Sequence, residues 1–234
     1  MIRHFALLLA AVLSFTAAAA QVPASSPSQD VQVALDTSAG RIIVAVHLAK
    51  APITARNFLR YVDQKRLDGT TFYRAVGTAD YGFVQGGTQN DPARTLPPIA
   101  HEFTTQTGLT HDEGALSMAR YAPGSATGDF FIVLGKMPSM DAQPALPGDN
   151  QGFAVFAHVV EGMDVVRAIL SAPKSPTEGE GVMKGQMLQQ SIRIMTARRL
   201  PGSFRAQKFG GLLLLQGEDR PRAFRSRSAL PFGG

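Results

Sequence analysis

Arg74 is the residue of this chain whose type and surroundings point most directly to chemistry. It lies in the aromatic and apolar run FYRAV (Phe72–Val76), and a second run that contains an amide, FVQGG (Phe83–Gly87), follows it. A guanidinium presents its N–H donors in a rigid planar fork. Beside an apolar slot, such a cationic donor stabilises charge or an electron pair that develops during a reaction. Arg74 and Gln85 are therefore candidate functional residues. The alternatives are an arginine at a strand edge and a glutamine that satisfies the following turn.

Other kinds of site find little support in the sequence. The chain has no cysteine, which excludes disulfides, thiol catalysis and zinc–thiolate sites. Its five histidines lack the spacing of metal ligands, and we expect Glu102, next to His101, to be structural. Serine-hydrolase, phosphate-loop and dinucleotide-binding signatures are missing as well. We therefore expect no metal site and no cofactor.

Three blocks of sequence, in a fixed order, carry a family resemblance. The first is FYRAV with FVQGG, the second is GALSMAR with SATGDFFI (Gly114–Ile132), and the third is NQGFAVFAHVVEGMDVVRAI (Asn150–Ile169). With the opening VALDTSAGRIIVAV, they resemble the cyclophilin family of peptidyl-prolyl cis–trans isomerases, from about Val31 to Thr196. Any one block would be weak, whereas all of them in order with compatible gaps are specific.

That resemblance implies a reaction in which no covalent bond is made or broken. Rotation about an X–Pro bond meets a barrier of about 18–20 kcal/mol because amide resonance is lost, and uncatalysed exchange is slow. A catalyst must hold the proline ring in an apolar pocket and must bind the twisted amide better than the planar one. In the twisted form, the proline nitrogen becomes pyramidal and can accept a hydrogen bond.

The resemblance also assigns roles to individual positions. Arg74 matches the catalytic arginine, and Gln85 matches the glutamine before Gly-Gly, which would orient Arg74 or bind the substrate backbone. Phe131, the second Phe of F-F-I, would form the floor of the proline pocket. Plain core packing is the alternative for every apolar position. The other substrate-binding residues that we predict are Phe72, Phe83, Met118, Ala119, Arg120, Met140 and Phe153. The implied partners are unfolded or flexible polypeptides that contain proline.

Several positions depart from the family's usual pattern. Asp129 stands where the family usually has Gln, and Arg120 stands where Asn usually follows M-A. The stretch 75–84 is longer than usual, which makes Tyr81 an alternative to Phe83 as the pocket aromatic. These departures keep a second function open, that of a weakly active or inactive cyclophilin that binds proline-containing segments as a chaperone. Two further departures are positions where many eukaryotic members have Trp and His, namely Ser139 and Phe153.

Alternating apolar residues and frequent turn residues predict a mainly β fold. An apolar stripe predicts one helix, with Thr54 as its N-cap and its end near Asp68. A second helix is predicted at 162–168. The fold class that we expect is a cyclophilin-like closed eight-stranded antiparallel β-barrel capped by two α-helices. The predicted strands lie at 31–36, 41–48, 70–76, 83–87, 116–119, 130–134, 153–160 and 190–196.

The first twenty residues resemble a secretory signal peptide. A basic start precedes the apolar stretch Phe5–Phe15, and Ala18–Ala20 has the small-residue pattern of a cleavage site. The apolar stretch is too short to span a bilayer. We therefore expect signal cleavage, a periplasmic location and no stable membrane insertion. Residues 21–30 would form a flexible linker, and 31–197 would form a monomeric isomerase domain.

The net charge of +5 is concentrated near the C-terminal end. Residues 198–234 carry eight Arg or Lys and two acids, whereas 21–197 are slightly acidic. A folded nucleic-acid-binding surface is therefore not expected. The segment 198–234 lacks periodicity and has many helix and strand breakers, which predicts a disordered tail. A solvated extension is the favoured interpretation, and contact with anionic lipid is the alternative.

Overall fold

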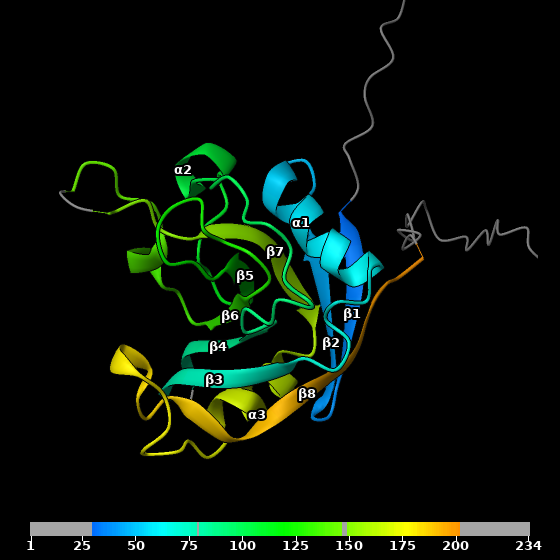
Figure 1. Ribbon diagram of the computed structural model, residues 1–234. Coiled ribbons are helices and arrows are strands. Elements are labelled where there is room, and N and C mark those ends of the chain that lie inside the picture. Colours follow the sequence, from blue (N-terminus) through cyan, green and yellow to red (C-terminus); the bar gives the residue numbers. More distant parts are fainter. Residues whose placement is uncertain (1–29, 79, 147–148, 202–234) are drawn as a thin grey trace, which may run out of the picture. The chain divides into compact units, whose positions relative to one another are not determined.

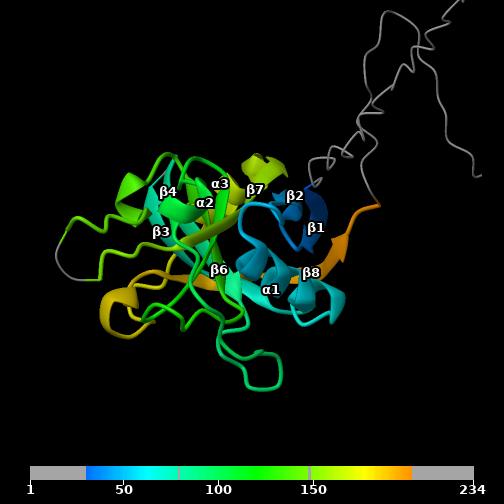
Figure 2. The same ribbon diagram turned by 90° about the horizontal axis from the view of Figure 1, so that it is seen from above.

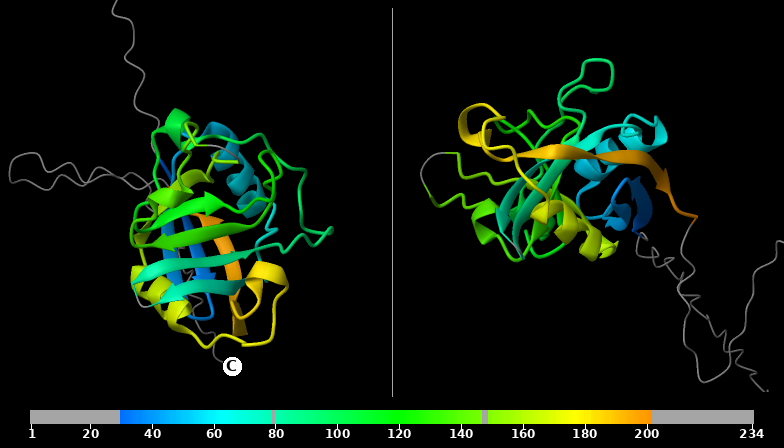
Figure 3. Two further views of the ribbon diagram at one scale, coloured as in Figure 1. Left: turned by 90° about the vertical axis from the view of Figure 1, so that its left-hand side faces the viewer. Right: turned by 90° about the horizontal axis from the view of Figure 1, so that it is seen from below.

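Eight strands close into one antiparallel barrel (Figures 1 and 3). The computed structural model describes residues 30–78, 80–146 and 149–201, so the predicted signal peptide, nearly all of the linker and the tail beyond 201 lie outside it. The strand order is β1-β2-β7-β5-β6-β4-β3-β8, and β8 pairs back with β1. The bounds are β1 Val31–Thr37, β2 Gly40–Val46, β3 Thr71–Thr78, β4 Tyr81–Gly87, β5 Ala115–Met118, β6 Phe130–Leu134, β7 Ala154–Glu161 and β8 Met187–Arg199. The predicted closed eight-stranded antiparallel barrel is confirmed.

Two longer helices lie on opposite sides of the barrel (Figures 1 and 3). Helix α1 (Pro52–Asp63) packs against β7 and β8, and α3 (Met163–Ser171) packs against β2, β3 and β4. Phe58 of α1 inserts between Phe130 and Phe156, with ring centroids 5.6 and 5.0 Å away. The apolar face of each helix thus covers apolar ends of the strands, which buries both sets of side chains.

The prediction of two helices missed a third, the short α2 (Thr104–Thr107). Its four residues, TTQT, carry no apolar stripe, so no helical periodicity marks them. Two single-turn 3-10 helices, Pro138–Met140 and Gly181–Met183, complete the regular structure of the described residues. Pro138–Met140 matters for the site because it carries a cavity residue.

The predicted N-cap of the first helix is wrong. Helix α1 begins at Pro52, with Ala51 at the N-cap, and Thr54 is buried in its first turn. The missing cap comes from Glu102, whose carboxylate accepts hydrogen bonds from the backbone N–H of Ile53 (3.0 Å) and of Thr54 (2.8 Å) and from Thr54 Oγ1 (2.7 Å). Orphan N–H groups of a helix start need such acceptors. Glu102 is therefore structural, as expected.

Strand β8 continues beyond the expected end of the domain. Arg198 and Arg199, which we assigned to the tail, still pair with β1. Arg198 also forms a salt bridge with Asp68 (2.7 Å), and Arg199 forms one with Asp63 (2.6 Å). Two of the cationic residues of the predicted tail thus belong to the barrel. Within the described ranges, no helix has the length and apolar character that crossing a membrane would require.

Candidate active site

The register of the barrel places Arg74, Gln85 and Phe131 side by side. Arg74 of β3 pairs with Gln85 of β4, and Gln85 pairs with Phe131 of β6. Directly opposite residues on neighbouring antiparallel strands have Cβ atoms about 4.5–5.5 Å apart on one face of the sheet. That face is the outer one, because Val84 and Ile132 are fully buried in the core and successive strand residues point to opposite faces.

A β-bulge in β3 turns two consecutive side chains to this outer face. The pairing of β3 with both of its neighbours shifts between Phe72 and Arg74, which makes Tyr73 the extra residue. Phe72 and Ala75 are fully buried, whereas Tyr73 and Arg74 between them line a cavity. The bulge therefore brings Tyr73 as well as Arg74 into the site.

The cavity beside this row has a volume of about 470 Å³. Such a volume is typical of sites that enclose a small ligand or a few side chains. All of the predicted site residues except Phe72 and Met118 line it: Arg74, Phe83, Gln85, Ala119, Arg120, Phe131, Met140 and Phe153.

The two exceptions, Phe72 and Met118, lie in the core. Phe72 is fully buried and packs edge-on against Phe130, with ring centroids 5.8 Å apart. Met118 is almost completely buried at the end of β5. The prediction placed both Met118 and its neighbour Ala119 at the pocket, but Met118 is the last residue of the buried β5, and only Ala119, which follows the strand, lines the cavity. In β3, the bulge at Tyr73 separates Phe72 and Arg74, which would share a face in a regular strand, so Phe72 faces the core and Arg74 faces the cavity.

Two glutamine carbonyls hold the Arg74 guanidinium. Nη1 donates to Oε1 of Gln85 (2.9 Å), while Nε and Nη2 donate to Oε1 of Gln186 (2.9 and 2.5 Å). The guanidinium carbon also lies 5.3 Å from the centre of the Phe83 ring, a cation–π contact. Burial lowers the pKa of Arg74 from its ordinary value, but a guanidinium keeps its proton at neutral pH. The site thus presents an oriented cation.

A chain of hydrogen bonds continues from Gln85 to a buried carboxylate. Gln85 Nε2 donates to the Tyr73 hydroxyl (2.7 Å), which donates to Oδ2 of Asp129 (2.9 Å). Oδ1 of Asp129 accepts from the backbone N–H of Gln89 (2.8 Å) and from Thr88 Oγ1 (3.3 Å). Burial raises the pKa of Tyr73 and of Asp129. We call the chain Arg74–Gln85–Tyr73–Asp129 the relay.

Aromatic rings form the floor of the cavity around Phe131. Phe83 lies 5.4 Å from Phe131 in a tilted arrangement, and Phe153 lies 5.3 Å from it edge-on. The His111 ring stacks on Phe131 at 6.0 Å. Tyr81, the alternative to Phe83, is exposed at the start of β4 and lies outside the cavity. The pocket aromatic is therefore Phe83.

His111, whose ring stacks on Phe131, makes two polar side-chain contacts beneath the cavity floor. Its Nδ1 lies 2.6 Å from Oδ1 of Asp141, and its Nε2 lies 3.0 Å from Ser117 Oγ. The order Ser-His-Asp resembles a hydrolase triad, but Ser117 and His111 are fully buried and do not line the cavity. Asp141 follows Met140, so this contact instead anchors the single-turn helix that carries Met140.

Comparison with known proteins identifies the family. Residues 31–198 match the family model described as "Cyclophilin type peptidyl-prolyl cis-trans isomerase/CLD". The chain belongs to the cyclophilin-type peptidyl-prolyl isomerases. The match covers every residue of the relay and all of the barrel except Arg199, the last residue of β8.

Curated relatives and a solved structure agree with this assignment. A peptidyl-prolyl cis-trans isomerase of Streptomyces antibioticus is 39% identical over 63% of this cyclophilin and 87% of the relative. One of Acinetobacter baylyi is 34% identical over 71% of this chain and 84% of its own. A solved Cryptosporidium parvum cyclophilin type isomerase has a TM-score of 0.59 at 17% identity and covers 74% of this chain and 98% of its own. This last similarity shows the fold.

Arg120, one departure from the usual cyclophilin pattern, lines the cavity beside Phe153. Its Nε donates to the carbonyl of Gly152 (2.8 Å), and its terminal nitrogens donate to the Asp149 carboxylate (2.8 and 3.2 Å). The guanidinium carbon lies 5.1 Å from the centre of the Phe153 ring. Arg120 thereby holds the segment before β7 next to the Phe153 ring.

Sequence reasoning missed Tyr73 and the segment between α3 and β8. This segment lies beside β3 (yellow, Figures 1 and 2), and the backbone N–H of Ala75 donates to the Gln186 carbonyl (3.0 Å). The only signal for Tyr73 was its place next to Arg74 in FYRAV, and in a strand without a bulge it would face the opposite side from Arg74. Nothing in the sequence marks Gln186, which is 112 positions from Arg74. The cavity residues that this segment and the start of β8 contribute are Gly179, Glu180, Val182, Met183 and Met187.

Proposed function

We propose that this cyclophilin accelerates rotation about X–Pro bonds of exported polypeptides, with the proline ring on Phe131 and Arg74 as the hydrogen-bond donor to the twisted amide. Family membership makes the chain a peptidyl-prolyl cis–trans isomerase. The observation that carries the mechanism is the pairing of Arg74, Gln85 and Phe131 along three neighbouring strands. It places a cation at the edge of an aromatic pocket.

The donor count at Arg74 supports this role. An arginine has five N–H donors, and the described residues take up three of them through Gln85 and Gln186. Two donors therefore remain for a ligand in the cavity. Because the proline nitrogen accepts a hydrogen bond only when the amide is twisted, these donors stabilise the transition state more than the ground state. The part-buried setting strengthens that interaction.

Catalysis is tested with a short Ala-Pro peptide and exchange NMR. The purified protein is expected to accelerate cis–trans exchange, and Arg74→Ala is expected to lower kcat/KM about a hundredfold or more, the loss typical of removing one preorganised donor. Arg56→Ala removes an exposed arginine of α1 and is the matched control. Full activity of Arg74→Ala overturns the mechanism. Peptide binding without accelerated exchange in the wild type would instead support the proline-binding chaperone.

Export is the second part of the proposal and depends on residues 1–20, which lie outside the described residues. The sequence pattern there supports cleavage after Ala20 and release into the periplasm. The test is expression of the full chain in a Gram-negative host, followed by cell fractionation and mass spectrometry. A periplasmic protein that begins at Gln21 supports the proposal. An uncleaved protein in the cytoplasm contradicts it.

A further inference from the structure

We propose that Asp129 is a positioning residue for Arg74 and that it acts through Tyr73 and Gln85 by setting the direction of the relay. The inference rests on the proposed role of Arg74 as donor. It concerns a position where this chain departs from the usual cyclophilin pattern, and it gives that departure a function. Asp129 itself reaches Arg74 through two intermediate side chains.

The relay has one direction because its last member only accepts hydrogen bonds. An ionised carboxylate carries no donor, so the Tyr73 hydroxyl points its single proton at Asp129 Oδ2 (2.9 Å). The hydroxyl oxygen is then an acceptor, and Gln85 must turn its NH₂ group toward it (2.7 Å). The Gln85 carbonyl consequently faces Arg74 Nη1 (2.9 Å). The buried carboxylate thus decides which end of the Gln85 amide meets the guanidinium.

Asp129 is itself fixed from the other side. Its Oδ1 faces the backbone N–H of Gln89 (2.8 Å), a donor that cannot reverse. Close packing adds to this, because a Cβ on Gly87 would lie 2.6 Å from Oδ1 of Asp129 and 2.5 Å from the Gly128 carbonyl oxygen, while the backbone of Gly87 has φ +133°. Gly87 is therefore required where β4 passes Asp129.

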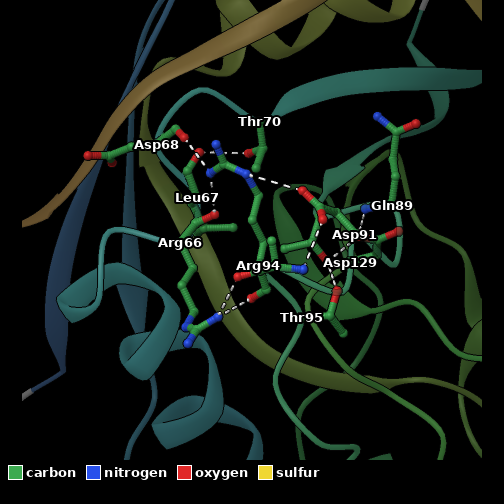
Figure 4. A network of polar contacts seen from close by, with 11 residues as sticks. Arg66, Leu67, Asp68, Thr70, Gln89, Asp91, Arg94, Thr95 and Asp129 are labelled. Carbon is green, nitrogen blue, oxygen red and sulfur yellow. Dashed lines mark hydrogen bonds and ion pairs between the residues drawn. The ribbon is translucent and has the colours of Figure 1, made fainter.

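A wider network holds the segment after β4 that bears Gln89 (Figure 4). Figure 2 shows that this segment projects from the barrel before the chain returns to α2. Arg94 Nη1 donates to the carbonyls of Arg66 (3.1 Å) and Asp68 (2.7 Å), and Arg66 Nη1 donates to the Arg94 carbonyl (2.9 Å). Thr95 Oγ1 donates to Thr88 Oγ1 (3.1 Å). The Gln89 N–H is thereby held in place on Asp129.

Replacing Asp129 by Asn reverses the relay without changing its shape. One end of the new amide would be an NH₂ group. If this NH₂ group faced the backbone N–H of Gln89, two donors would meet. The NH₂ group must therefore face Tyr73 and donate to its hydroxyl oxygen. Tyr73 would then donate to Gln85, whose carbonyl must turn toward it. The NH₂ group of Gln85 would face the Arg74 guanidinium, donor against donor, and Arg74 would lose one of its orienting contacts.

The first experiment measures kcat and KM of Asp129→Asn in the peptide exchange assay, with a thermal unfolding scan of each variant. We expect kcat/KM to fall about tenfold, chiefly through kcat. A loss of this size is expected when one hydrogen bond to a charged group is removed. Tyr73→Phe removes the middle hydroxyl and is expected to cause a similar loss. Asp164→Asn is the matched control, because Asp164 is exposed on α3 and does not line the cavity. It should keep full activity.

The second experiment asks whether Asp129 acts through Gln85. Asp129→Asn is combined with Gln85→Met, which keeps the length of the side chain and removes its amide. If the relay operates, the double variant loses no more activity than Gln85→Met alone. In ¹⁵N NMR, the side-chain amide signals of Gln85 should shift in Asp129→Asn and stay unchanged in Asp164→Asn. A structural or direct substrate role of Asp129 predicts multiplied losses instead.

The outcomes separate this inference from the proposed function. If Arg74→Ala keeps full activity, the proposed mechanism fails whatever Asp129 does. If Arg74→Ala is inactive while Asp129→Asn is fully active, the mechanism stands and the positioning role of Asp129 is overturned. The same conclusion follows if Arg74→Ala is inactive and the activity losses of Asp129→Asn and Gln85→Met multiply in the variant that combines them.

Discussion

At the scale of single residues, the partners of Arg74 are neutral. Both hydrogen-bond acceptors that the described residues provide for its guanidinium are amide carbonyl oxygens, from Gln85 and Gln186. A carboxylate in either place would also orient the guanidinium, but it would cancel most of its charge. Neutral acceptors fix the direction of the donors and leave the positive charge for the substrate. The nearest buried carboxylate, Asp129, is kept two side chains away.

This arrangement predicts the effect of placing a charge next to Arg74. Gln186→Glu keeps the acceptor and adds a negative charge, so the orientation should survive while the charge is neutralised. We expect kcat/KM to fall about tenfold with the thermal unfolding midpoint unchanged or higher. Gln189→Glu, at an exposed position of β8, is the matched control and should retain activity. Equal activities of the two variants would contradict the interpretation.

At the scale of elements, α1 depends on an acceptor from another part of the chain. Its N-cap residue, Ala51, has no side-chain oxygen, and Glu102 supplies the acceptors from 48 and 49 positions away. Glu102 is 8% exposed, so these hydrogen bonds are shielded from water. A buried donor that loses its acceptor costs more free energy than an exposed one.

Glu102→Gln is therefore expected to destabilise the fold rather than the site. An NH₂ group would replace one oxygen and would oppose a backbone N–H of Ile53 or Thr54. We expect the free energy of unfolding to fall by about 1–3 kcal/mol, with kcat/KM of the folded protein unchanged. Urea denaturation measures the first quantity. Glu161→Gln, an exposed position on β7, is the control, and an equally small effect at both positions would show that the cap contributes little.

At the scale of the whole molecule, a buried histidine, His111, and a half-buried one, His158, link the free energy of unfolding to pH. Nδ1 of His158 in β7 lies 3.0 Å from Nε2 of His47, which follows β2 and whose Nδ1 lies 2.9 Å from Oδ2 of Asp30. Burial is the largest cause that lowers the pKa of His158, and the charge of His47 lowers it further; Lys50 acts in the same direction and Asp112 in the opposite one. Protonation of both imidazoles would place two like charges between neighbouring strands.

Burial also lowers the pKa of His111 behind the cavity floor, against the opposing effect of Asp141. The unfolded chain therefore binds protons to His111 and His158 at a higher pH than the folded barrel does. The contribution of these two histidines to the free energy of unfolding is fully present above the pKa of an unfolded histidine, about 6.5, and is lost as the pH falls below that value. We expect the free energy of unfolding, from urea denaturation, to be lower at pH 5.5 than at pH 7.5. His158→Leu should reduce this difference, and a flat profile in the wild type would contradict the assignment.

The amino-acid sequence alone determined the fold class and eight of the twenty residues that line the cavity. The resemblance carried by the order of the blocks allowed Arg74, Gln85 and Phe131 to be named together, and alternation and turn residues predicted the strands. These features are local, because strand alternation and turn residues act over a few positions. Strand alternation and turn residues therefore do not depend on which distant side chains meet in the closed barrel.

Only the tertiary structure decided which side chains meet across the barrel. The bulge at Tyr73 depends on pairing with both β4 and β8, so the sequence prediction included Phe72 in the pocket and did not include Tyr73. Gln186 reaches Arg74 because β8 closes against β3, and Glu102 reaches α1 because the long segment after β4 returns over the barrel. Such contacts join residues far apart in sequence, and a local pattern carries no information about them. Asp129 is visible in the sequence as a departure, but its partner Tyr73 is defined only by the closed barrel.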